Sequence, residues 1–276
     1  MQTNPQEYYD HHQWLYNLFW SRQALHYGLW TPGTKTLDQA IENTNLVVAE
    51  KLKLTSSDHV LDLGSGTGGT GISLTRNFGC RVTGVTISPR QKKQAERFAA
   101  RAGVSNRVNF VLGNFDEQLP LPGQTFTAAV TIESFCHAHD KLKTLHQLHR
   151  WLKPGARLAI VNGFLIRDQL TPAEQEIYNT FRGGWQVASL VTITSIKLML
   201  TNAGFRDVRS EDWTAEILPS SRHILRLGKI SIDLFRWLAR RNIISSRWFE
   251  NSRSMAEQVK MFDGFARYEI VTAVNS

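Results

Sequence analysis

The stretch that decides the fold runs from His59 to Gly69 and reads HVLDLGSGTGG. Its first five residues are mostly apolar and lead directly into glycines, which predicts a buried parallel strand, a tight turn and a helix that begins near Thr67. Gly64, Gly66 and Gly69 fit the spacing G-x-G-x-x-G. Small residues at these positions let the backbone pass close to a ligand, and the N–H groups of the following helix point toward it. The pattern therefore predicts a nucleotide-type ligand at the end of the strand.

The position of the carboxylate distinguishes between ligands of this type. A dinucleotide-binding fold places Asp or Glu at the end of its second strand, about 20 residues after the glycines, where it binds a ribose. Here the second strand, within residues 80–88 (CRVTGVTIS), ends without an acid, and the carboxylate precedes the glycines at Asp62. An acid in this D-x-G-x-G-x-G turn can bind the amino group of an amino-acid ligand while the glycines admit the rest. The alternative is that Asp62 only caps the turn.

With Asp62 followed by Gly64, Ser65 and Gly66, this segment resembles the first motif of the class I S-adenosylmethionine-dependent methyltransferases. The resemblance implies an α/β fold with a Rossmann-like, doubly wound, seven-stranded sheet whose last strand is antiparallel. It also implies S-adenosyl-L-methionine as the cofactor, bound in part by these four residues.

The order of the predicted elements indicates one domain over all 276 residues. Strand, helix, strand and helix follow one another from His59, which predicts a parallel sheet covered on both faces. We divide the domain into a helical N-terminal cap (1–54), a cofactor-binding core (55–165) and two insertions (166–190 and 214–265) that form a lid over the substrate.

The composition is that of an ordinary globular protein, with 42% hydrophobic and 20% charged residues. No apolar run reaches the roughly 18 residues of a membrane span, and the N-terminus lacks the plan of a signal peptide, so we expect a cytoplasmic protein. Cys80 and Cys136 are the only cysteines and suggest neither a disulfide framework nor a zinc site. The formal net charge of +8 admits nucleic acid, anionic lipid or an acidic substrate as partners.

Residues 5–30 are dense in aromatic side chains and predict a helix with an apolar face, followed by the loop HYGLW (26–30). These aromatics either pack on the side of the domain or cover the cofactor, because aromatic faces attract a sulfonium or a carbocation and exclude water. The HYGLW loop resembles a segment of sterol, tocopherol and cyclopropane-lipid methyltransferases in which a tyrosine or tryptophan touches the cofactor. This resemblance makes Tyr27 and Trp30 candidate cofactor contacts.

The segment GVTISPRQ (84–91) carries both a helix start and a cofactor motif. Ser88 at the N-cap and Gln91 three residues later form a predicted capping box, with proline at the first helical position. The segment is also similar to the G-V-T-x-S-x-x-Q of the lipid and sterol subgroup, in which the threonine and glutamine bind the ribose in place of the missing acid. We therefore expect Thr86, Ile87 and Gln91 to contact the cofactor.

A third strand over Val108–Leu112 leads into GNFDEQLP (113–120). At this position the family places an acid or amide and an apolar residue against the adenine. The resemblance thus assigns Asn114 to the exocyclic amine and Phe115 to the face of the ring, with Asp116 as the rival polar ligand. The alternative for Asn114 is an ordinary turn amide.

A fourth strand over Phe126–Ile132 leads into ESFCHAHD. Because the carboxyl ends of parallel strands line the ligand crevice, Ile132 should lie at the cofactor, and Glu133 and His137 should face cofactor and substrate. Glu-Ser-x-x-His is similar to the segment of sterol, tocopherol and prenyl C-methyltransferases in which the glutamate is a base or cation stabiliser. The alternative is that Glu133 pairs with an arginine or accepts backbone N–H groups. His137 and His139 lack an evident third ligand, so we expect no metal site.

The second insertion contains a predicted basic amphipathic helix over residues 222–241. Such a helix can lie on an anionic membrane surface, or it can be a solvated helix packed on its own core. Nucleic acid is not expected as a partner, because no nucleic-acid-binding motif accompanies the charges. The charged residues that share the polar face of this helix are Arg222, Arg226, Lys229, Asp233, Arg236 and Arg240.

The residues and the resemblance together predict transfer of a methyl group to carbon of a small, lipophilic, isoprenoid-type acceptor. Glu133 would remove a proton or stabilise a cation, with His137 beside it. The alternative within the same cofactor class is O- or N-methylation of a small aromatic or amine, with His137 or Glu133 as the base. The glycine spacing alone suggests a hydride-transferring oxidoreductase, and a membrane-binding module without catalysis is a further alternative. The sequence indicates no oligomeric state.

Overall fold

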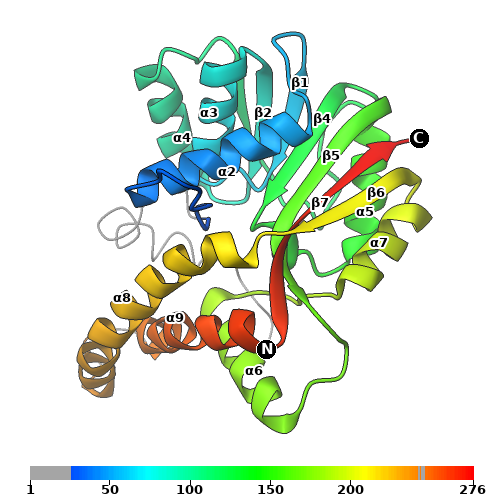
Figure 1. Cartoon of the computed structure of the whole chain (residues 1–276). Coiled ribbons are helices and arrows are strands. Elements are labelled where there is room, and N and C mark those ends of the chain that lie inside the picture. Colours follow the sequence, from blue (N-terminus) through cyan, green and yellow to red (C-terminus); the bar gives the residue numbers. More distant parts are fainter. Residues whose placement is uncertain (1–25, 242, 244–245) are drawn as a thin grey trace.

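The computed structural model describes residues 26–276 except 242 and 244–245, and its centre is one seven-stranded sheet (Figure 1). The strand order is β3-β2-β1-β4-β5-β7-β6. Strands β1 to β5 pair in parallel, whereas β7 runs antiparallel to both of its neighbours, as predicted. The strands are β1 (His59–Leu63), β2 (Arg81–Thr86), β3 (Val108–Leu112), β4 (Phe126–Ile132), β5 (Leu152–Leu165), β6 (Phe205–Asp212) and β7 (Ala266–Asn275).

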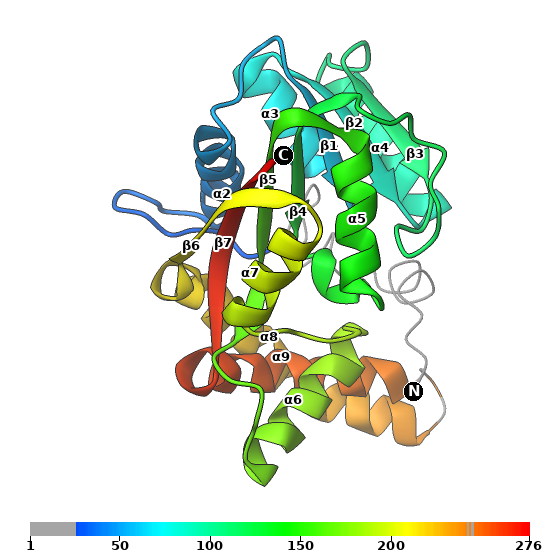
Figure 2. The ribbon, with the colours of Figure 1, turned by 90° about the vertical axis from the view of Figure 1, so that its right-hand side faces the viewer.

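Helices cover both faces of the sheet, which confirms the doubly wound α/β class (Figures 1 and 2). Helices α2, α3 and α4 pack on one face, and α5 and α7 pack on the other. The helix predicted for residues 5–25 lies outside the described residues. The described helices are α2 (Leu37–Lys51), α3 (Gly69–Phe78), α4 (Pro89–Arg101), α5 (Lys141–Trp151), α6 (Pro172–Trp185), α7 (Ile193–Asn202), α8 (Thr214–Arg240) and α9 (Ser246–Gly264), with the short 3-10 helix η1 (Phe135–His137).

The sheet has an apolar core on each of its two faces, and alternate side chains of a strand pack into one core or the other. Val60 of β1 packs in the cluster with α2, α3 and α4, whereas its neighbours Leu61 and Leu63 pack with α5 and α7. Successive side chains of a strand point to opposite faces, so a parallel strand buried on both sides is nearly all apolar. The apolar run before the glycines follows from this position in the centre of the sheet.

The turn after β1 is longer than predicted, because α3 begins at Gly69 and not near Thr67. Gly68 has a φ of 86°, in the left-handed region that favours glycine. A Cβ atom on Gly68 would lie 2.6 Å from the ring of Phe110. Because Gly68 has this backbone conformation and this close contact, it is the N-cap residue and α3 begins after it, at Gly69.

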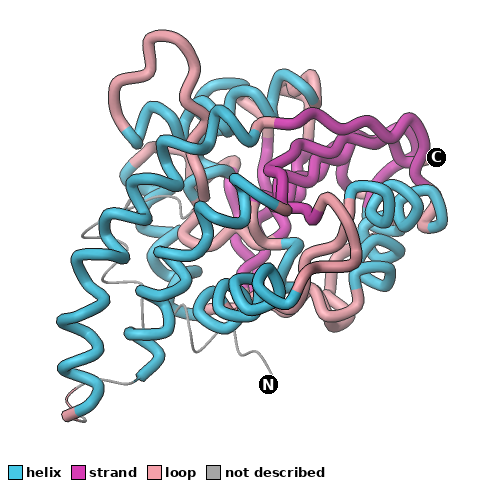
Figure 3. The backbone as a smooth tube through the Cα atoms, turned by 60° about the horizontal axis from the view of Figure 1, so that its bottom comes forward, coloured by secondary structure: helices cyan, strands magenta, loops and turns pink. Residues whose placement is uncertain are grey.

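The second insertion lies outside the sheet and forms two helices, where the sequence predicted one basic helix over residues 222–241. Helix α8 begins at Thr214 and contains Pro219 in its second turn. It packs along α9, which in turn contacts α6 of the first insertion. Figure 3 shows α8 and α9 side by side, extending away from the strands. Within the described residues, no helix combines the length and the apolar character needed to cross a membrane.

Candidate active site

Asp62 is a buried carboxylate in β1, two residues before Gly64. Its side chain is 2% exposed, and its Oδ2 has no hydrogen-bond partner among the described residues. Burial raises the pKa of Asp62 to about 7, opposed by the backbone N–H of Gly71. An unpartnered charge in such a place is unfavourable. A bound ammonium group would satisfy this oxygen and favour the ionised carboxylate.

The glycines beside Asp62 differ in what surrounds them. A Cβ atom on Gly64 would lie 2.2 Å from the Cβ of Ser134, whereas one on Gly66 would meet only the Gln91 side-chain nitrogen, at 4.0 Å. Gly64 is therefore needed for packing, and Gly66 borders open space. The buried hydroxyl of Ser65, between them, has no hydrogen-bond partner among the described residues. Open space beside an unpartnered donor and acceptor is what a polar ligand requires.

The end of β2 and the start of α4 bring three predicted residues to the same place. Ser88 caps α4 by accepting a hydrogen bond from the Gln91 backbone N–H (3.1 Å). Thr86 Oγ1 donates to the Gln91 side-chain Oε1 (3.2 Å), and both side chains are buried. Ile87 is half-buried beside them. We call residues 62–68 and 86–91 the glycine edge.

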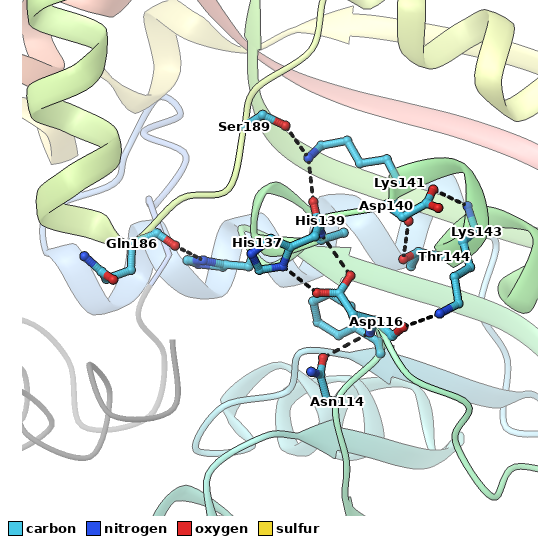
Figure 4. Close-up of polar contacts among 12 residues, drawn as sticks. Asn114, Asp116, His137, His139, Asp140, Lys141, Lys143, Thr144, Gln186 and Ser189 are labelled. Atoms are coloured by element: carbon cyan, nitrogen blue, oxygen red, sulfur yellow. Dashed lines mark hydrogen bonds and ion pairs between the residues drawn. The ribbon is translucent and has the colours of Figure 1, made fainter. Parts of the chain in front are cut away.

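The residues predicted for the adenine make contacts within their own loop. Asn114 Oδ1 accepts the backbone N–H of Asp116 (3.0 Å), as in the alternative of an ordinary turn amide. The Asp116 carboxylate accepts the backbone N–H (2.9 Å) and the Nδ1 proton (2.8 Å) of His139 (Figure 4). Phe115 packs, half-buried, against the core on the side of α5. The pairing of Asp116 with His139 was not predicted.

Glu133 follows β4 directly and has a backbone φ of 50°. Its Oε1 accepts the backbone N–H of Tyr27 (2.6 Å) and the hydroxyl of Tyr268 (2.8 Å). Oε2 accepts no hydrogen bond from any described residue, and the side chain is only half-buried. Burial raises the pKa of Glu133 to about 8, opposed by the two hydrogen bonds. Of the two alternative contacts considered, the structure shows the backbone N–H group and, among the described residues, no arginine.

Tyr27 connects Glu133 to the second insertion. Its hydroxyl donates to Oε1 of Gln258 in α9 (2.7 Å). Its ring meets Phe262 and Tyr268 edge to face, with centroid separations of 5.7 and 5.5 Å. We call Tyr27, Glu133, Gln258 and Tyr268 the Glu133 cluster. The loop before the core, β4, β7 and α9 thus meet at one carboxylate.

Trp30 lies apart from this cluster, against the start of α8. Its indole Nε1 donates to Ser220 Oγ (2.9 Å), and its backbone N–H donates to the Glu216 carbonyl (2.9 Å). Ile132, 9% exposed, ends β4 and packs in the core on the side of α3. Of the aromatic pair predicted in the loop, only Tyr27 contacts Glu133.

His137 ends η1 and contacts the C-cap of α6. Its Nδ1 lies 3.0 Å from the backbone carbonyl of Gln186 (Figure 4). A carbonyl only accepts hydrogen bonds, so Nδ1 carries the proton and Nε2 has a lone pair. Burial lowers the pKa of His137 to about 4, which keeps the imidazole neutral. Gln186 presents its carbonyl from the left-handed region, with a φ of 54°.

Residues 186–190, which follow α6, are hydrogen-bonded to η1 and to the residues just after it. The carbonyl of Cys136 lies 3.2 and 3.3 Å from the N–H groups of Ala188 and Ser189. The buried ammonium of Lys141 donates to the Ala138 carbonyl and to Ser189 Oγ, each at 2.9 Å (Figure 4). We call residues 186–190 the strap. The described residues contain no group of three or more side chains suited to hold a metal ion.

Comparison with known proteins gives the family. A family model described as a methyltransferase domain matches residues 60–155. An O-methyltransferase of Pyrenophora dematioidea is 32% identical over 198 residues, which are 71% of this chain and 73% of that protein. The 27-O-demethylrifamycin SV methyltransferase of Amycolatopsis mediterranei is 30% identical and aligns over 77% of each chain.

The fold agrees with this relationship. The crystal structure of geranyl diphosphate C-methyltransferase from Streptomyces coelicolor superposes with a TM-score of 0.74, covering 99% of this chain and 96% of that one at 18% identity. That structure contains S-adenosyl-L-homocysteine. The chain belongs to the class I S-adenosylmethionine-dependent methyltransferases, and S-adenosyl-L-methionine is its cofactor.

Proposed function

We propose that this enzyme methylates a hydroxyl oxygen of a small, largely apolar acceptor, and that Glu133 takes up the proton of that hydroxyl. The two sequence relatives described above are both named for methylation at oxygen. The C-methyltransferase shares the fold at 18% identity, so its chemistry carries less weight. This proposal replaces the carbon acceptor favoured by the sequence as the leading candidate.

The glycine edge fits the cofactor that the family uses. When bound, S-adenosyl-L-methionine supplies an electrophilic methyl group on a positively charged sulfur. Asp62, with its unpartnered Oδ2, would bind the ammonium group, and Ser65 would bind beside it over the open face of Gly66. Thr86 and Gln91 would bind the ribose, with Ile87 at the rim. Asn114, Phe115 and Ile132 remain candidates for the adenine side.

The observation that carries the proposal is the half-fixed carboxylate of Glu133. Two hydrogen bonds hold Oε1, while Oε2 has none among the described residues. Its pKa of about 8 makes Glu133 a competent base near neutral pH, because general bases work best when their pKa is close to the working pH. Oε2 can therefore accept the proton while Oε1 keeps the carboxylate oriented.

His137 would orient the acceptor. Its neutral imidazole holds its Nδ1 proton on the Gln186 carbonyl, which fixes the orientation of the ring. The rings of Tyr27, Phe262 and Tyr268 are buried and pack edge to face on one another, so they support the loop that holds the Glu133 carboxylate.

Product analysis with a deuterated methyl donor tests the proposal. Matched pairs of small acceptors, one with a hydroxyl and one with an alkene in its place, are incubated with the enzyme, and the methylated atom is located by NMR. Methylation at oxygen that depends on Glu133 supports the proposal. Methylation at carbon, or unchanged turnover by Glu133→Gln with normal cofactor binding, contradicts it.

Carbon methylation of an isoprenoid-type acceptor is the second candidate, and the aromatic rings favour it. Tyr27 and Tyr268 donate to the Glu133 carboxylate, and their buried rings pack with Phe262 at centroid separations of 5.5 to 6.3 Å. Aromatic faces can stabilise a carbocation, and Glu133 would then remove a proton from it. The NMR position of the labelled methyl group separates the two candidates.

A further inference from the structure

Helix α8 presents a continuous basic face. Arg222, Arg226, Lys229, Arg236 and Arg240 are all exposed, and their spacing places them on one side of the helix. Asp233 is the acid on this face, and it lies 3.4 Å from Arg236. At about 1.5 Å per residue, the face extends for roughly 27 Å. Its charge is therefore strongly positive over most of the length of α8.

Large apolar side chains lie at the end of the same face. Trp237 is 49% exposed, and the guanidinium of Arg241 lies 4.0 Å from the centre of its ring. Ile243, just beyond α8, is 59% exposed. Figures 1 and 3 show that this end of α8 points away from the sheet. A planar surface could thus approach these side chains without meeting the core.

The opposite side of α8 is already covered by α9. Gly228 lies so close to α9 that a Cβ atom on it would be 2.7 Å from the Cβ of Met255. Phe235 meets Trp248 edge to face, with centroids 5.6 Å apart. The apolar side of the helix therefore packs inside the protein, and its basic side faces outward. Packing inside the molecule does not account for the exposed tryptophan among the cations.

We propose that this face of α8 docks on an anionic phospholipid surface. Cations attract the negatively charged headgroups, and tryptophan and arginine side chains are favoured at the interface between headgroups and acyl chains. Each cation near such a surface contributes about a factor of five to binding, so five of them supply a large part of the affinity. The inference does not depend on which atom is methylated, because it concerns a surface outside the Glu133 cluster.

Vesicle flotation of the whole chain tests this inference. Phosphatidylcholine vesicles with and without phosphatidylserine serve as probes, at low and at high salt. The test variant replaces Arg226, Lys229, Arg236 and Arg240 with glutamine. The matched control replaces four exposed cations of α3 and α4 with glutamine and so removes the same net charge. These control positions are Arg76, Lys93, Arg97 and Arg101.

Binding should require phosphatidylserine, weaken at high salt and fall by nearly three orders of magnitude, about fivefold for each of the four cations, in the α8 variant. The control should bind almost as the unmodified protein does, and Trp237→Ser should weaken binding even at low salt. Both charge variants should keep the thermal transition and the cofactor affinity of the unmodified protein. Equal losses in the two charge variants, no binding to anionic vesicles, or a preference for duplex DNA over vesicles would overturn the proposal.

Discussion

The glycine edge and the Glu133 cluster are built in opposite ways. The glycine edge comes from one stretch of chain, residues 62–91, and keeps buried polar atoms without partners among the described residues. The Glu133 cluster joins side chains 106, 135 and 231 residues apart in sequence, and its hydrogen bonds connect its own members. Both regions leave polar atoms without partners among the described residues, in the cluster Glu133 Oε2 and the buried Gln258 Nε2, so the two regions differ in how far apart in sequence their members lie.

We propose that the glycine edge binds the cofactor and that the Glu133 cluster carries the chemistry. Changes at the glycine edge should alter the affinity for S-adenosyl-L-methionine and leave the acceptor side intact. Changes in the Glu133 cluster, the strap or α9 should alter turnover at nearly constant cofactor affinity. An enzyme that did not separate these effects would contradict the proposed division of roles.

Glu133→Gln should produce the largest effect. The amide keeps the size of the side chain and removes the base, so kcat should fall by about 10² to 10⁴ while the cofactor Kd stays constant. Because the pKa of Glu133 is raised to about 8 and the ionised form is the base, kcat/KM should rise with pH up to about 8 and then level off. The variant should lose this rise. Steady-state kinetics across pH checks both results.

Tyr268→Phe is the control for Glu133→Gln. It removes the hydroxyl that donates to Oε1 but keeps the ring and the carboxylate. Loss of a hydrogen bond that favours the ionised form should move the pH dependence of kcat/KM to higher pH, with a smaller loss of kcat than in Glu133→Gln. A pH profile that does not move would show that Glu133 is not the titrating base.

Asp62→Asn should have the next largest effect, with opposite signs for binding and stability. Loss of the carboxylate should weaken cofactor binding about a hundredfold, as for a charge-assisted hydrogen bond. The folded pKa of about 7 lies above the ordinary value of 3.8. The raised pKa therefore costs no free energy of unfolding below about pH 4, where Asp62 is protonated in both the folded and the unfolded state. The free energy of unfolding falls as the pH rises from there through 7. The variant without cofactor should gain on the order of 3 kcal/mol at pH 8.

Calorimetric titration and thermal unfolding at pH 5 and pH 8 measure these two effects of Asp62→Asn. The gain in stability should shrink at pH 5, where the natural side chain is mostly protonated. Unchanged cofactor affinity, or a loss of stability at pH 8, would show that Asp62 caps the turn and does not bind the ligand.

Much of the fold could be predicted because its signals are local. The strand before the glycines and the N-cap at Ser88 are each encoded within about ten residues, whereas the antiparallel direction of the last strand was implied by the family resemblance. The glycine edge shares this property. The early start predicted for α3 was wrong because the demand for glycine at position 68 comes from Phe110, a distant residue.

The Glu133 cluster could be predicted only in part. Glu133 and Tyr27 lie in segments that resemble family motifs. Tyr268 lies in β7 and Gln258 in α9, and the sequences of these two elements carry no such motif. Their role arises from contacts that no local pattern encodes. Lys141 and Gln186 escaped prediction for the same reason, because their partners Ser189 and His137 belong to other segments.

Two glycine substitutions sharpen the comparison within the glycine edge. Gly64 and Gly66 both have positive φ, so alanine at either is unfavourable by about 1–2 kcal/mol. Only Gly64→Ala also forces its Cβ against Ser134. Gly64→Ala should therefore lower Tm markedly, whereas Gly66→Ala should fold and lose about tenfold in cofactor affinity. Unchanged cofactor affinity in Gly66→Ala would mean that the space beside Gly66 is not a ligand site.

The smallest effect should come from Gln186, where the strap meets His137. Both Gln186→Val and Gln186→Gly lose the hydrogen bond from the side-chain amide to the Gly183 carbonyl. They differ in that glycine accepts the left-handed φ of 54°, whereas a β-branched residue disfavours it. Gln186→Val should displace the carbonyl that holds Nδ1 and lower kcat several-fold, with kcat nearly unchanged in Gln186→Gly. ¹⁵N NMR of the His137 ring should show a loss of the Nδ1-protonated form in the valine variant only, because only that variant moves the carbonyl. The same tautomer and kcat in both variants would show that the strap does not orient His137.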